Sequence, residues 1–283
     1  MILIVDAGNT TITFAAVSEE NDSIIKRFKV EEDSFQIDAK IIEQSITANS
    51  DGTSQEAQEL LDKWCKEIVK ALCDKELSCG EKIFSKAVIS TVVVEDEKAL
   101  ALIAERISNK YIFVNKDNCG LDLSKYSANT LGADRMADTV AALHKYGNKL
   151  PLIVFDLGTA TTCNVIDEKG CFLGGIIAPG LMTAANALLS KASKLKEYKV
   201  NEPLSIIGNT SQGCIDSGIV YGHALMIEGI IRKVSEKLGK KCVAVMTGGN
   251  TEHIRDYIDS PFYYEPDLLL QGLICIGKKG IND

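Results

Sequence analysis

The chain has 283 residues and a net charge of −8, with 46% hydrophobic and 25% charged residues. This length and composition are typical of a globular protein with room for two domains, and the acidic balance argues against broad nucleic-acid binding. Nine cysteines without a C-x-x-C pair favour reduced thiols over a disulfide framework. Because there is no basic-then-apolar leader and no apolar run near the ~20 residues of a membrane span, we expect a cytoplasmic protein without membrane partners.

The first motif follows residues 2–5, a short apolar run that predicts a buried strand. It reads Asp6-Ala7-Gly8-Asn9-Thr10-Thr11, so small and polar residues replace the apolar ones. Glycine lets the backbone approach a ligand, hydroxyls and amides can donate to phosphate oxygens, and an aspartate can hold Mg²⁺ or its water shell. An ordinary hairpin turn is the alternative interpretation of this stretch alone.

The rest of the first half predicts an α/β domain of the order β-β-β-α-β-α-β. Residues 31–52 are acidic and ambiguous, although 37–46 could carry a short helix. The expected strands are 2–5, 13–17, 24–30, 86–94 and 111–114, and the expected helices are 54–72 and 96–107. A change to Asn, Lys, Asp, Gly and Ser at residues 115–127 predicts a boundary between domains 1–118 and 119–283.

The second half repeats the first motif. Residues 152–155 form another apolar run, followed by Asp156-Leu157-Gly158-Thr159-Ala160-Thr161, and the two aspartates lie 150 residues apart. The expected strands are 152–155, 162–167, 171–177, 242–246 and 262–264, and the expected helices are 133–145, 180–189, 211–238 and 266–277. Such a repeat predicts a duplicated domain with two phosphate-facing hairpins. Two domains facing each other would place both hairpins and the Gly248-Gly249 turn around a nucleotide.

A further pair of residues suits catalysis. Phosphoryl transfer to an alcohol needs a carboxylate that orients the hydroxyl and accepts its proton. Asp134, at the start of a predicted helix, is a candidate base, and its neighbour Arg135 could clasp the carboxylate of an acidic substrate with two hydrogen bonds. In the alternative interpretation, Asp134 caps the helix and Arg135 makes a surface ion pair.

Five motifs, in order over nearly the whole chain, resemble those of type III pantothenate kinases in the acetate and sugar kinase/Hsp70/actin superfamily. They are residues 6–10, Gly132-Ala133-Asp134-Arg135, residues 156–161, residues 174–180 and Asn209-Thr210. The resemblance implies duplicated actin-like (ribonuclease H-like) domains, each β-β-β-α-β-α-β-(α), with an interdomain nucleotide cleft. It also implies ATP-dependent phosphorylation of pantothenate, the first step of coenzyme A biosynthesis, by a homodimer.

The resemblance assigns residues to roles. The ATP-binding residues would be Asp6, Ala7, Gly8, Asn9, Thr10, Thr11, Ile12, Thr13 and Thr159. The pantothenate-binding residues would be Gly132, Ala133, Asp134, Arg135 and Thr210, with Asp134 as the catalytic base. Asp156 would help to hold a monovalent cation, K⁺ or NH₄⁺, and Mg²⁺ would accompany ATP.

The chain departs from the family in three loops. Tyr126 lies one place out of register before Gly132 and no proline accompanies it, residues 94–96 replace a Pro-rich turn, and residues 31–52 look like extra length. Two alternatives therefore stay open: a kinase of another small alcohol on the same fold, or a non-catalytic nucleotide-binding regulator. Intact Asp134, Arg135 and Thr159 argue against the regulator.

Overall fold

The computed structural model describes residues 1–48, 53–192, 195 and 197–279. The chain divides into two compact units, and most contacts between residues lie within one unit or the other. Unit 1 contains Met1–Gly120, Asn129–Val140 and Leu269–Asp283, and unit 2 contains Leu121–Ala128 and Ala141–Leu268. The division between domains at residues 118 and 119 stays a prediction.

Unit 1 is built on a five-stranded sheet. Its strands are β1 (Ile2–Ala7), β2 (Thr11–Val17), β3 (Ile24–Glu31), β4 (Lys86–Thr91) and β5 (Tyr111–Phe113), in the order β3-β2-β1-β4-β5. The first three are antiparallel neighbours, and β4 and β5 continue the sheet in parallel. The chain crosses over between β3 and β4, so the turn that joins β1 to β2 lies beside the segment that follows β4.

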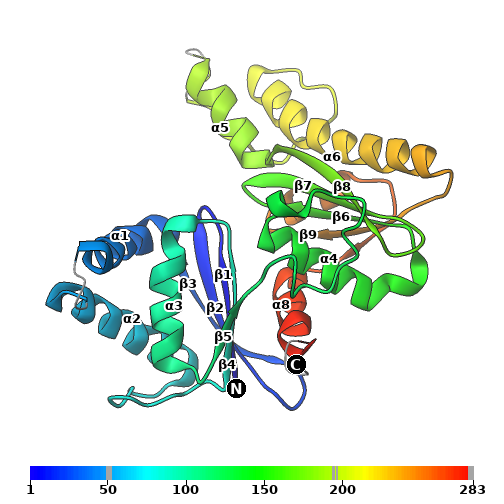
Figure 1. Cartoon of the computed structure of the whole chain (residues 1–283). Helices are drawn as coiled ribbons and strands as arrows, with labels where there is room; N and C mark the ends of the chain where they lie inside the picture. The colour runs from blue at the N-terminus through cyan, green and yellow to red at the C-terminus, as the bar shows by residue number, and fades with distance from the viewer. Residues whose placement is uncertain (49–52, 193–194, 196, 280–283) are drawn as a thin grey trace. The chain divides into compact units, whose positions relative to one another are not determined.

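Three helices cover one face of this sheet: α1 (Glu32–Ala48), α2 (Gln55–Cys73) and α3 (Glu97–Ile107) (Figure 1). The Ser54 hydroxyl accepts a hydrogen bond from the backbone N–H of Ala57 at 3.3 Å, as expected of the predicted N-terminal cap. Trp64 is 3% exposed and packs edge-on against Phe35, with ring centroids 5.0 Å apart. Within the segment that was ambiguous in the sequence, residues 32–48 therefore form the helix α1. The Phe35 side chain of this helix is buried in the core.

Unit 2 repeats the arrangement. Its strands are β6 (Leu152–Leu157), β7 (Ala160–Ile166), β8 (Phe172–Pro179), β9 (Val243–Thr247) and β10 (Phe262–Tyr264), in the order β10-β9-β6-β7-β8. Its pairings match those of unit 1 strand for strand. The helices of the second half are α4 (Ala133–Tyr146), α5 (Leu181–Lys191), α6 (Ser211–Leu238), α7 (Thr251–Ile254) and α8 (Leu268–Lys279). Each half thus has two helices between its third and fourth strands; both were expected in the second half, whereas the predicted order of the first half counted one.

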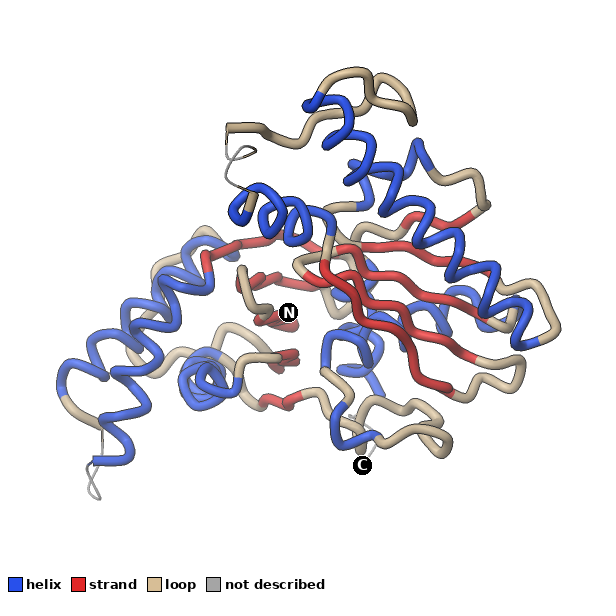
Figure 2. The backbone as a smooth tube through the Cα atoms, turned by 90° about the horizontal axis from the view of Figure 1, so that it is seen from above, coloured by secondary structure: helices blue, strands red, loops and turns tan. Residues whose placement is uncertain are grey.

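The longest helix, α6, lies along one face of the unit 2 sheet (Figures 1 and 2). Val220, Ala224, Ile227 and Ile231 recur at helical spacing and are buried in the core of that unit. By length and hydropathy alone α6 could cross a membrane, although the sequence has no continuous apolar run of that length. Its buried residues instead give it the role of a core helix.

The nine cysteines are all free thiols. Cys79 in unit 1 and Cys214 in unit 2 are exposed, whereas Cys65 is buried in α2. Burial raises the pKa of the Cys65 thiol to about 12.

Candidate active site

Two aspartates occupy equivalent places in the two sheets. Asp6 is the fifth residue of β1 and Asp156 the fifth residue of β6, and both strands have the same pattern of buried and half-buried residues. Their register partners are Thr13 and Ser90 for Asp6, and Thr162 and Thr247 for Asp156. Paired residues share one face of a sheet, so each carboxylate stands between two hydroxyl side chains. The repeated motif therefore corresponds to a repeated structure.

The first hairpin turn is held by its own backbone and by two neighbouring segments. Gly8 N–H donates to the Thr11 carbonyl at 3.1 Å, and Glu32 N–H donates to the Thr10 carbonyl at 3.0 Å. Val92 N–H, just after β4, donates to the Ala7 carbonyl at 3.1 Å. The side chains of Asn9, Thr10 and Thr11 are exposed at this turn. They can therefore donate to an anionic ligand without breaking the fold.

The G-A-D-R motif lies beside this hairpin, in the same unit. A Cβ atom added to Gly132 would lie 3.6 Å from Val92 Cγ1, and Val92 is the residue bonded to Ala7. The same Cβ would lie only 2.4 Å from Asp134 Oδ1. Glycine is therefore needed at position 132, because any side chain there would occupy the place of the Asp134 carboxylate. Val92 therefore lies between the G-A-D-R motif, which contains the predicted base, and the first predicted ATP-binding turn.

Asp134 lies inside the first turn of α4. Its carboxylate accepts a hydrogen bond from Arg135 N–H at 2.7 Å. Burial raises the pKa of Asp134, while this hydrogen bond and the Arg135 charge oppose the rise. Arg135 is 7% exposed, so it is not the surface ion-pair residue of the alternative interpretation. A raised pKa makes a carboxylate a stronger proton acceptor.

The second hairpin is bordered by the turn after β9. Gly248 has φ +87°, a conformation that favours glycine, and a Cβ atom there would lie 2.4 Å from Asp156 Oδ1. The Gly248 backbone therefore lies directly against the Asp156 carboxylate. Thr159 is exposed at the tip of the hairpin. Unit 2 thus brings together Asp156, Thr159 and the Gly248-Gly249 turn.

Two other residues from the sequence analysis have structural contacts. Thr210 is the N-cap of α6, where its hydroxyl accepts a hydrogen bond from Gly213 N–H at 3.0 Å. Tyr126 packs edge-on against Phe172 with centroids 5.0 Å apart, and its ring is 3.4 Å from the place of a Cβ on Gly174. The role of Thr210 in substrate binding stays a prediction.

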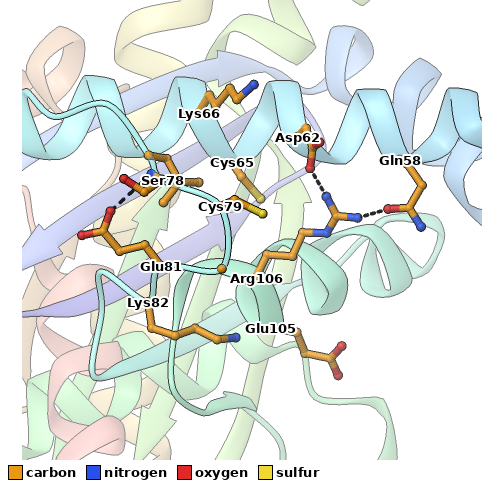
Figure 3. Close-up of a pocket in the computed structure, with 12 residues that line it drawn as sticks. Gln58, Asp62, Cys65, Lys66, Ser78, Cys79, Glu81, Lys82, Glu105 and Arg106 are labelled. Atoms are coloured by element: carbon orange, nitrogen blue, oxygen red, sulfur yellow. Dashed lines mark hydrogen bonds and ion pairs between the residues drawn. The ribbon is translucent and has the colours of Figure 1, made fainter.

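A hollow of about 700 Å³ on unit 1 involves other residues (Figure 3). It is lined by α2, by residues 77–82 and by the end of α3. Arg106 in its wall is bonded to Asp62 and Gln58 of α2, and Glu81 accepts a hydrogen bond from Ser78 N–H at 3.2 Å. Its lining includes none of the residues predicted to bind ATP, pantothenate or a cation.

The sequence analysis missed one buried acidic pair. Asp96 is fully buried just before α3, and neither of its carboxylate oxygens has a hydrogen-bond partner. Burial and the nearby charge of Glu32, itself 4% exposed, raise the pKa of Asp96 to about 7. Glu32 lies in the acidic segment that was ambiguous in the sequence and Asp96 at the start of an expected helix, and at both places a buried and a solvated carboxylate look alike in the sequence.

The sequence model of the type III pantothenate kinase family matches residues 2–233. The chain belongs to this family. The match confirms the predicted family, and with it a phosphotransferase that phosphorylates pantothenate with ATP in coenzyme A biosynthesis. Because the family is a kinase family, binding of nucleotide and substrate follows from membership.

One solved structure supports the fold of this pantothenate kinase family member. A conserved putative Baf family transcriptional activator from Campylobacter jejuni is similar at 17% identity and a TM-score of 0.59, over 99% of this chain and 100% of that one. The ethanolamine utilization protein EutJ from Carboxydothermus hydrogenoformans has 14% identity and a TM-score of 0.49, covering 98% of this chain and 89% of that one. The two sheets of identical strand order confirm the predicted duplicated actin-like domains.

Proposed function

We propose that Asp134 is the base in phosphoryl transfer from ATP to the primary hydroxyl of pantothenate. The observation that carries this proposal is the position of Val92, which is bonded to Ala7 of the first hairpin and would lie 3.6 Å from a Cβ atom on Gly132, two residues before the half-buried Asp134. The hydroxyl proton goes to the Asp134 carboxylate, the hydroxyl oxygen bonds to the γ-phosphorus, and the bond to the β-phosphate oxygen breaks to release ADP.

ATP is bound, in this proposal, by residues 6–13 and by Thr159. Exposed hydroxyl and amide groups at the first hairpin can donate to phosphate oxygens, and the backbone at Gly8 leaves room for them. The duplicated hairpins support this assignment, because Asp6 and Asp156 each end a central strand between hydroxyl residues.

Pantothenate is bound by residues 132–135 and by Thr210. The buried Arg135 guanidinium presents a fork of N–H groups that matches a carboxylate, and pantothenate carries one carboxylate. The hydroxyl of Thr210 accepts a bond as the N-cap of α6, and its proton stays available to donate to the substrate.

The proposed site also includes two cations, Mg²⁺ and a monovalent cation. Among the described residues, no three acidic, histidine or cysteine side chains form a group that could hold a metal ion. Mg²⁺ would therefore be held jointly by the ATP phosphates and by Asp6 or its water shell, and would neutralise phosphate charge. Asp156 fits a monovalent cation, because it is a single carboxylate whose strand neighbour, Thr162, has a buried hydroxyl oxygen with no hydrogen-bond partner.

A homodimer is supported by apolar side chains exposed on unit 2. They are Ile176, Ile177, Met182, Leu188, Leu204, Ile206, Ile207 and Leu225. Exposed apolar side chains that form a contiguous patch are typical of protein interfaces. Ile177→Lys should give a monomer in size-exclusion chromatography with light scattering. Ile37→Lys is the matched control, because both isoleucines are 65% exposed and Ile37 is on α1 of unit 1; a dimeric Ile177→Lys would contradict this interface.

The function is tested by coupled measurement of ADP release with and without pantothenate, in K⁺ and in a bulky quaternary ammonium salt of equal ionic strength. We expect ADP release only with pantothenate and a higher rate in K⁺. Equal release with and without pantothenate would mean that pantothenate is not the acceptor, and release only with another small alcohol would favour a kinase of that alcohol. No release with any small alcohol would favour a non-catalytic regulator, the role for which the Campylobacter jejuni protein is named. We also propose that the protein is cytoplasmic, in line with its free thiols.

A further inference from the structure

We infer that Asn250 is a positioning residue that holds the second phosphate hairpin in its nucleotide-binding conformation. The residue follows the Gly248-Gly249 turn after β9. Its backbone N–H donates to the Leu157 carbonyl at 2.9 Å, and its side-chain Nδ2 donates to the Gly158 carbonyl at 2.8 Å. One residue thus bonds two successive carbonyls of the hairpin from outside it.

The opposite side of the hairpin is held by the start of α5. Gly180 N–H donates to the Thr159 carbonyl at 3.0 Å, and the Thr183 hydroxyl donates to the same oxygen at 2.7 Å. A Cβ atom on Gly180 would lie 2.2 Å from the Gly158 carbonyl oxygen, so the two backbones are in close contact. The carbonyls of residues 157, 158 and 159 therefore all accept hydrogen bonds from surrounding segments.

This arrangement fixes the orientation of the turn. With three successive carbonyls bonded to protein donors, the peptide planes of the hairpin cannot rotate freely. Thr159 lies between two of these peptide planes, so the direction in which its side chain leaves the backbone is fixed as well. In the first hairpin the Ala7 carbonyl, which is equivalent to that of Leu157, likewise accepts a hydrogen bond from a backbone N–H, that of Val92.

Without the Asn250 side chain, the Gly158 carbonyl would lose its donor and the turn could change conformation. A neutral hydrogen bond contributes about 0.5–1.5 kcal/mol, which corresponds to roughly a two- to tenfold change in an equilibrium constant. Since Asn250 acts through the hairpin, its loss should weaken phosphate binding and leave pantothenate binding unchanged. The inference rests on the proposed function for the role of the hairpin in ATP binding.

The test compares Asn250→Ala with Asn118→Ala. Asn118 is a matched control because its Nδ2 also donates to a backbone carbonyl at 2.8 Å, that of Phe113, away from the hairpin. ATP binding is measured by calorimetry, which does not depend on turnover, and tripolyphosphate is measured as a competitor that lacks adenosine. We expect both ligands to bind Asn250→Ala about five- to tenfold more weakly, with the pantothenate KM and the melting temperature close to those of the wild type and of Asn118→Ala.

Three results would overturn the inference. Unchanged ATP affinity in Asn250→Ala would remove the positioning role, and weaker ATP binding with unchanged tripolyphosphate binding would make Asn250 an adenosine contact. An equal rise of the ATP and pantothenate KM values with a lower melting temperature would make it merely structural. If the wild type binds ATP without phosphorylating pantothenate, the proposed function fails, but the calorimetric comparison still decides the role of Asn250.

Discussion

The backbone N–H of Arg135 donates a hydrogen bond to the carboxylate of its neighbour Asp134, at 2.7 Å. The bond joins two adjacent residues of α4, so the helix itself sets the direction of the carboxylate. One oxygen is thereby oriented by the chain, and Gly132 leaves the space that it occupies. The geometry makes Asp134 a preoriented group whose role can be separated from that of Arg135.

Asp134→Asn should lower kcat by about 10²–10⁴, because the amide keeps the shape of the side chain but cannot accept the substrate proton. ATP affinity should stay within a few-fold of the wild type, since the substitution lies outside the hairpin. Steady-state kinetics and calorimetry check both parts. Loss of ATP binding together with activity would indicate a structural role for Asp134.

The pH dependence of kcat/KM should reflect the raised pKa of Asp134. Only the ionised carboxylate accepts a proton, so kcat/KM should rise as pH increases through this pKa and then level off. Because burial raises the pKa, the rise should lie above the ordinary aspartate value of 3.8. Rates are measured between pH 4 and pH 9 in buffers of constant ionic strength. If kcat/KM instead rises at or below the ordinary pKa of aspartate, a group other than Asp134 controls the pH dependence.

Arg135→Met should raise the pantothenate KM about 10- to 100-fold, because a hydrogen-bonded charge pair is lost. The decisive comparison uses the pantothenate analogue in which an alcohol replaces the carboxylate. The wild type should prefer pantothenate strongly, and Arg135→Met should bind the two compounds about equally. If the preference survives in the variant, Arg135 does not bind the carboxylate.

Stability should decrease as pH rises from about 4 to about 7 because of Asp96. Its pKa is raised to about 7 from an ordinary 3.8 by burial and by the charges of Glu32 and Glu95, against a smaller opposing effect of Lys40. The folded state therefore binds more protons than the unfolded state in this range, so the free energy of unfolding falls until Asp96 is ionised.

Asp96→Asn should remove much of this decrease, which is measured by urea unfolding at pH 5 and pH 8. The variant should gain stability over the wild type at pH 8 and show a smaller difference at pH 5. The exposed Asp117 gives the control, and Asp117→Asn should keep the slope of the wild type. An unchanged slope in Asp96→Asn would show that another group binds the proton.

Gly272→Ala should destabilise the protein by about 1–3 kcal/mol through overpacking. Gly272 in α8 packs so closely on α4 that a Cβ atom would lie 1.9 Å from the Ala137 carbonyl oxygen. Gly229→Ala in α6 is the control, since its Cβ meets nothing within 4 Å and should stabilise the helix by about 0.5–1 kcal/mol. Equal effects in thermal unfolding would contradict the close packing of α8 on α4.

Much of the fold could be predicted because the sequence repeats its own pattern. An apolar run that ends in D-x-G can be read locally, and the structure places both copies at the centre of equivalent sheets. The helix α1 was harder to identify, since its polar positions outnumber the few that reach the core, such as Phe35 and Ile42. Its packing depends on α2 and α3, which a local pattern does not contain.

The residue types of the site could be predicted from the sequence, but the residues that hold them in position were harder to predict. Asp134 and Arg135 could be identified as neighbours in sequence, whereas Val92 became relevant only when folding placed it against both Gly132 and Ala7. Asn250 is 92 residues from Gly158, so its hydrogen bond has no sequence pattern. The only local indication was the Thr-Gly-Gly-Asn turn after a predicted strand.

The distribution of thiols has a practical consequence. Cys79 and Cys214 are exposed and belong to different units, while burial keeps Cys65 protonated and slow to react with maleimides. Fluorescent dyes attached to the two exposed sulfurs would form an energy-transfer pair that reports on the separation of the halves during turnover. Replacing the partly exposed Cys73 and Cys275 would leave one exposed thiol on each half, so any response of this separation to nucleotide could be followed without introducing new cysteines.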